Sequence, residues 1–67
     1  MSKDYVVRLR ATMQQMERLL LALQDLRENV LPKDPRLFAT MAEAPLEDLQ
    51  RLRGEIGGFV EEAKASG

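Results

Sequence analysis

The chain has no cysteine and no histidine among its 67 residues, and its aromatic residues are limited to two phenylalanines and one tyrosine. Without thiols and imidazoles there is no disulfide framework, no zinc site of the usual kinds and no histidine-centred acid–base catalysis. The adjacent carboxylates Glu47 and Asp48, like Glu61 and Glu62, do not face each other on a helix and form no catalytic dyad. We therefore expect a protein that is not an enzyme, with no catalytic, cofactor-binding or metal-binding residues.

Neither sign of charge dominates, because ten Lys and Arg residues nearly balance eleven Asp and Glu residues. This balance provides no overall field that would recruit nucleic acid or anionic lipid. The longest apolar run is residues 19–23, whereas a membrane span needs roughly 20 apolar residues. Residues 1–4 do not form a secretory signal either. We expect a cytoplasmic protein with no membrane partner.

Glycine and proline are absent from residues 3–31, which predicts one long helix over this range. Its apolar residues recur three and four positions apart, the heptad spacing of a coiled coil, with a polar interruption at Thr12. Ser2 and Asp4 are candidates for the helix cap. The predicted seam consists of Tyr5, Leu9, Met16, Leu19, Leu23, Leu26 and Val30.

Prolines predict where this helix ends and where the next one begins. Pro32 lacks an N–H and biases the residue before it away from helical dihedral angles. Asp34 followed by Pro35 is typical of an N-cap and a first helical position. We expect a short helix over about 35–43, with three apolar residues toward one side: Leu37, Phe38 and Met41.

Pro45 predicts a second break, followed by a second long helix over about 45–64 and a frayed tail at 65–67. Gly54, Gly57 and Gly58 each cost this helix about 1 kcal/mol relative to alanine. Three explanations stay open for these glycines: close contact with another backbone, a bend, or no role. The predicted seam of this helix is Leu49, Leu52, Ile56, Phe59 and Ala63.

These elements predict a single all-α domain over residues 1–67, an antiparallel helical hairpin with a short connecting helix. The first helix is apolar on more sides than one partner helix can cover, and a chain this small without disulfides or metal has little core. We expect two hairpins to pair as a homodimer resembling a four-helix bundle. The alternative is a monomer in which the connecting helix covers Leu20 and Leu21. The expected interface residues are Met13, Met16, Leu19, Leu20, Leu23, Leu26, Leu37 and Phe38.

Residues 32–39 resemble the turn of type III secretion needle subunits, which are small helical hairpins with a Pro-x-x-Pro turn followed by an apolar pair and Ala. The chain length and two-helix layout are also similar to small secretion co-chaperones. This likeness covers eight of 67 residues. The aromatic residues that needle subunits have before their first helix are missing, so the likeness does not assign the chain to a family.

We expect the chain to act as a small protein–protein interaction or assembly module. The alternative is an adaptor, antitoxin-like or secretion-chaperone-like protein that becomes ordered on an unknown, larger protein partner. A small nucleic-acid-binding regulator is the least favoured class, because it is supported only by arginines along the helices. These arginines are Arg8, Arg10, Arg18, Arg51 and Arg53.

Overall fold

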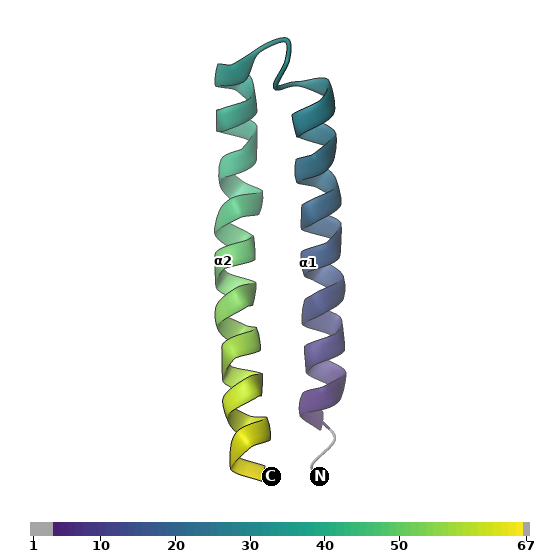
Figure 1. Cartoon of the computed structure of the whole chain (residues 1–67), viewed down its shortest axis with the longest axis vertical. Helices are drawn as coiled ribbons and strands as arrows, with labels where there is room; N and C mark the ends of the chain where they lie inside the picture. The colour runs from purple at the N-terminus through teal and green to yellow at the C-terminus, as the bar shows by residue number, and fades with distance from the viewer. Residues whose placement is uncertain (1–3, 67) are drawn as a thin grey trace.

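The structure, a computed structural model, describes residues 4–66 and consists of two antiparallel helices (Figure 1). Helix α1 spans Asp4–Asn29 and helix α2 spans Pro35–Ser66. The predicted all-α hairpin is therefore confirmed. The expected helix start at Lys3, the alternative cap Ser2 and the last tail residue, Gly67, lie outside the described residues.

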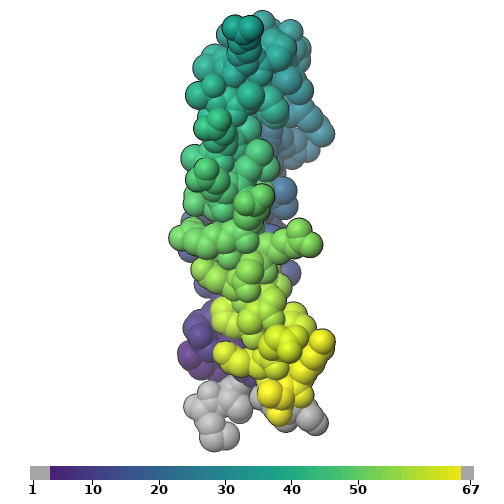
Figure 2. Space-filling model, turned by 90° about the vertical axis from the view of Figure 1, so that its left-hand side faces the viewer, coloured from purple at the N-terminus to yellow at the C-terminus, as the bar shows by residue number. Residues whose placement is uncertain are grey.

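The hairpin is a rod whose Cα atoms span 49 × 14 × 13 Å. Viewed from the side of α2, this helix covers the length of the rod (Figure 2). Helix α1 emerges on one edge near the turn and on the opposite edge near the other end, so the two helices cross at a small angle. The two helices therefore pack against each other along one face each.

The turn between the helices follows the predicted proline chemistry. Helix α1 was expected to end at Leu31, the residue before Pro32, but it ends two residues earlier, at Asn29. Pro32 has no N–H to donate and cannot continue the helix. The N–H of Asp34 closes the turn by donating to the carbonyl of Val30 at 2.8 Å. The carboxylate of Asp34 accepts a hydrogen bond from the N–H of Leu37 at 3.1 Å, which confirms Asp34 as the N-cap of α2.

The expected break at Pro45 is wrong, because α2 is one continuous helix and there is no separate connecting helix. A proline inside a helix loses one hydrogen bond and costs about 3 kcal/mol relative to alanine. Here the helix is held on both sides of Pro45 by Ala42 and Leu52, each only 2% exposed against α1. The tail expected to fray from Ala65 onward is also helical as far as Ser66.

The core is a single seam along the length of the rod. Every predicted seam residue of α1 is half-buried, and Thr12, the polar interruption, is 6% exposed. Within residues 4–65, only Thr12, Ala42 and Leu52 are buried, so the core is thin. Ala63, predicted for the end of the α2 seam, is exposed. The seam residues of α2 are Phe38, Ala42, Pro45, Leu49, Leu52, Ile56 and Phe59.

The fold expected for the alternative monomer, with residues 35–43 packed over the first helix, is also wrong, whereas the oligomeric state stays a prediction. These residues are the first turns of α2, and they leave Leu20 and Leu21 55% and 64% exposed. Of the three apolar residues expected on one side of this segment, Phe38 is half-buried, whereas Leu37 and Met41 are exposed. The apolar surface at the middle of α1 therefore has no cover within the hairpin.

The three glycines of α2 do not break the helix. Phe59, which follows them, keeps its half-buried place in the seam. A Cβ atom added at Gly54, Gly57 or Gly58 would meet nothing within 4 Å. The bend expected at these glycines is therefore wrong. No close contact within the described residues explains the three glycines.

Candidate association surface

The residues that flank the seam form two long sides with different chemistry. Residues seven positions apart lie on the same face of a helix in a heptad pattern. The residues that directly follow every second seam position form the side that we call the apolar side. Five of these eight residues define it as apolar, Val6, Met13, Leu20, Leu46 and Val60, and the other three are Arg27, Ala39 and Arg53. The side across the seam, which we call the polar side, carries Arg8, Gln15, Asp48, Glu55 and Glu62, together with the exposed Met41 near the turn.

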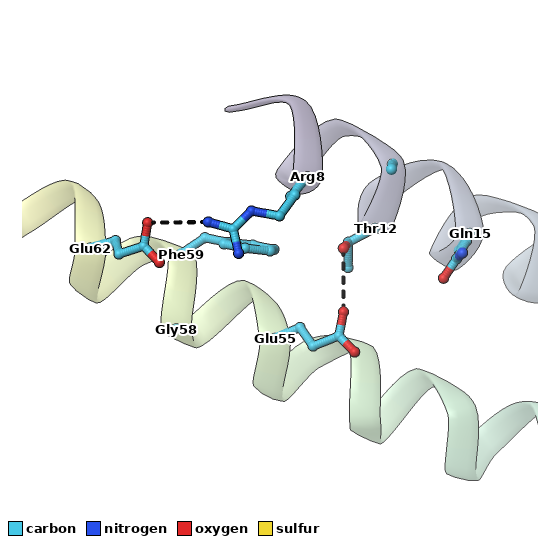
Figure 3. A pocket seen from close by; sticks show the side chains of 8 residues that line it. Arg8, Thr12, Gln15, Glu55, Gly58, Phe59 and Glu62 are labelled. Carbon is cyan, nitrogen blue, oxygen red and sulfur yellow. Dashed lines mark hydrogen bonds and ion pairs between the residues drawn. The ribbon is translucent and has the colours of Figure 1, made fainter. Parts of the chain in front are cut away.

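The polar side is held together by interactions between the helices (Figure 3). The guanidinium of Arg8 lies 5.3 Å from the ring centre of Phe59, and its Nη2 is 3.6 Å from Oε2 of Glu62. The hydroxyl of Thr12 donates to Glu55 at 3.4 Å. Arg8 and Glu62 are about half exposed, so their ion pair contributes less than about 1 kcal/mol. These contacts mainly fix the height of one helix against the other.

The hollow drawn in Figure 3 does not form a binding site for a small ligand. Its volume is about 450 Å³ and it is open to solvent along its length. The charged groups that line it already contact one another, since Arg8 is paired with Asp4 and Glu62 and Glu55 accepts from Thr12. Within residues 4–66, no buried side-chain nitrogen or oxygen is left without a hydrogen-bond partner.

The apolar side is exposed along the whole rod. Its five defining residues are 44–55% exposed. Near the turn, Leu20 and Leu46 border a groove of about 520 Å³, whose floor includes Leu23 and Phe38 from the seam. At the other end, Val6 and Met13 border a second hollow. Single exposed apolar residues are ordinary, but five of them gathered on one side of a small hairpin are typical of an interaction surface.

The structure divides the eight expected interface residues between different surroundings. Five of them contribute to the intrachain seam and are half-buried: Met16, Leu19, Leu23, Leu26 and Phe38. Met13 and Leu20 lie on the apolar side, and Leu37 is exposed on α2 near the turn. The role of these eight residues in association stays a prediction.

Three residues of the apolar side were not expected in the interface: Val6, Leu46 and Val60. Val6 precedes Met13 and Leu20 at intervals of seven, so its position could have been read from the sequence. Leu46 and Val60 are fourteen residues apart on α2. Their shared face was missed because a helix that breaks at Pro45 need not keep the same faces on both sides of the proline.

Other chemistry finds little support in this part of the chain. Within residues 4–66, no group of three acidic residues lies close enough to hold a metal ion. Across the same residues, neither helix has the length and apolar character to cross a bilayer. Two of the five arginines that could contact nucleic acid are paired with carboxylates, Arg8 with Asp4 and Glu62 and Arg51 with Asp48.

Protein-family models, curated proteins and solved structures were all compared with this chain, and none of the three comparisons gave a match.

Proposed function

We propose that this chain is a non-enzymatic assembly module that works as a homodimer, with the apolar sides of two hairpins packed into a four-helix bundle. The observation that supports this most directly is the amount of exposed surface. The hairpin has an accessible surface of 5435 Å², whereas a compact monomer of its mass, 7.6 kDa, has about 4,300 Å². The excess of about 1,100 Å² is comparable to the roughly 800 Å² that each partner contributes to a stable interface.

The shape of the rod indicates how such an interface must run. A long side, 49 Å by 14 Å between Cα atoms, presents roughly 700 Å² in projection. A contact at one end of the rod would therefore be too small for a stable dimer. The apolar side extends from Val6 and Val60 at one end to Leu20 and Leu46 near the turn, which supports a contact along most of the length.

Two neighbouring leucines provide a matched test of this proposal. Leu20 lies on the apolar side, whereas Leu21 is on the outer face of α1 and is slightly more exposed. We expect Leu20→Glu to abolish the dimer because it places a charge in the interface, and Leu21→Glu to leave the dimer intact. Light scattering after size-exclusion chromatography, over a hundredfold range of concentration, measures the mass of each variant. A wild-type chain that stays monomeric throughout would refute the proposal.

A second candidate function is that of an adaptor that becomes ordered on a larger protein. It is supported by the thin core, because a hairpin with three buried residues within its described range has little stability of its own. The groove beside Leu20 and Leu46 would accept an apolar helix of that protein. Circular dichroism separates the two candidates. The homodimer predicts melting that depends on concentration, and the adaptor predicts low helicity at every practical concentration.

A further inference from the structure

We infer that the second copy packs with its turn at the same end of the bundle, about a two-fold axis parallel to the helices, and that four charged residues select this orientation. The inference rests on the proposed self-association and adds its geometry. The four residues are Glu17 and Arg27 on α1 and Glu43 and Arg53 on α2.

Two of these residues, Arg27 and Arg53, lie on the apolar side, and the other two, Glu17 and Glu43, lie at its edge. Arg27 and Arg53 follow Leu20 and Leu46 at the interval of seven that defines the side. Glu17 lies one turn beyond Met13, beside which it borders the same hollow. Glu43 is at the position of α2 that corresponds to Glu17 on α1 in the heptad pattern. Charges at positions that directly flank a helical seam, where Arg27 and Arg53 lie, commonly set partner choice and orientation.

Contacts within the hairpin leave these charges without a strong partner. Within residues 4–66, Glu17, Glu43 and Arg53 form no ion pair, and Arg27 only approaches its neighbour Glu28, at 3.9 Å. The ion pairs that the hairpin does form lie elsewhere, as in the contact between Arg8 and Glu62 on the polar side. An approaching surface with complementary charges would therefore find these four groups available.

A two-fold axis parallel to the helices keeps every residue at its own height along the rod. When the two apolar sides face each other about this axis, α1 of each copy lies against α2 of the other copy, and the two run antiparallel. The residues that meet are therefore those that share a height within one hairpin. The ion pair between Arg8 and Glu62 and the hydrogen bond between Thr12 and Glu55 give registers that differ by three residues, so they define these heights to within one helical turn.

With this register, opposite charges meet across the interface. The residue numbers of Glu17 and Arg53 have the same sum as those of Arg8 and Glu62, and so do those of Arg27 and Glu43. In two antiparallel helices, pairs with equal sums share a height, and the sum for Thr12 and Glu55 is three smaller. Glu17 of one copy therefore lies within about one helical turn of Arg53 of the other, and Arg27 within the same distance of Glu43. By symmetry each pair occurs twice, which gives four complementary contacts along the dimer.

The opposite orientation, with the turns at opposite ends, brings like charges together. Its axis is perpendicular to the rod, so α1 of one copy packs against α1 of the other. Glu17 lies near the middle of α1 and would then approach Glu17 of the other copy. Like charges across an interface suppress the wrong arrangement, and this difference favours turns at the same end.

Charge reversal tests the pairing. We expect Glu17→Arg and Arg53→Glu each to weaken the dimer about tenfold, because each converts two attractive contacts into repulsive ones. The double variant restores the attraction with exchanged signs, so its Kd should return to within a few-fold of the wild-type value. Glu47→Arg, on the outer face of α2, is the matched control and should leave the Kd unchanged. Sedimentation equilibrium at low salt measures each Kd, because salt screens exposed charges.

Cross-linking tests the orientation independently, since the chain has no native cysteine. Mixed Glu17→Cys and Arg53→Cys chains, refolded together and oxidised, should give a disulfide between the two different chains, and Glu17→Cys alone should not. A dimer that ignores charge reversal, and that Glu17→Cys alone cross-links, would overturn the orientation while the proposed function stands. A wild-type chain that is monomeric at every concentration would overturn both.

Discussion

Replacing Pro45 with alanine tests whether α2 is continuous in solution. Pro45 lies well inside α2, where it cannot donate a hydrogen bond to the carbonyl of Met41. Removing an interior proline is worth about 3 kcal/mol. Against this gain, the half-buried proline ring loses two carbon atoms from the seam, which costs about 0.8 kcal/mol. We therefore expect Pro45→Ala to raise the free energy of unfolding by about 2 kcal/mol.

For a domain of this size, a gain of about 2 kcal/mol raises the melting temperature by roughly 8–16 °C. Thermal and urea unfolding followed by circular dichroism measure the change. All variants must be compared at one protein concentration, because association itself raises the apparent stability.

Pro35→Ala is the matched control, because the same substitution at the first position of the same helix removes no strain there. We expect it to change the free energy of unfolding by less than about 1 kcal/mol, with a small loss from the greater freedom of the unfolded chain. If both substitutions gave equally small changes, α2 would be broken at Pro45 in solution. The continuous helix, and with it the shared face of Leu46 and Val60, would then be refuted.

Five further substitutions test the cap, the core and the glycines, the first three by urea unfolding and the last two by sedimentation equilibrium. Asp34→Ala should lower the free energy of unfolding by about 1 kcal/mol, because the N–H of Leu37 loses its acceptor; no change would remove Asp34 as the cap. Leu52→Ala should cost about 2–4 kcal/mol, a large part of the stability of so small a domain, and an effect below about 1 kcal/mol would contradict its burial. Gly54→Ala should stabilise the monomer by about 0.5–1 kcal/mol, because its Cβ meets nothing within 4 Å, and destabilisation would indicate a contact at this face. Gly57, which shares the height of Met13 in the proposed dimer, should be the sensitive glycine: Gly57→Glu weakens association in sedimentation equilibrium, whereas Gly54→Glu does not.

Local sequence rules predicted most of the hairpin. The seam of α1 follows from the spacing of its apolar residues and from the lack of glycine and proline, which are properties of the helix itself. The turn follows from Pro32, Asp34 and Pro35 for the same reason, since a missing N–H and a capping carboxylate act within a few residues. These features needed no information about distant parts of the chain.

The local rule failed at Pro45, where a contact between helices outweighed it. Phe38, Ala42, Pro45, Leu49 and Leu52 continue at intervals of three and four through the proline. Packing of this row against α1 holds both parts of α2 in one helix, and tertiary packing often overrides helix propensity in this way. The sequence itself shows this regular spacing of seam residues. It would have predicted one continuous helix if the spacing had been trusted over the helix-breaking tendency of proline.

Helix period and composition are enough to predict a two-helix hairpin with more apolar surface than one hairpin can bury. Which part of that surface is left exposed depends on how the two helices pack against each other. The height of α1 against α2 depends on contacts such as that of Thr12 with Glu55, which are 43 residues apart. That height divides the flanking residues into a polar and an apolar side and determines which charges lie level with one another. No local pattern contains this information, because it arises only when the two helices meet.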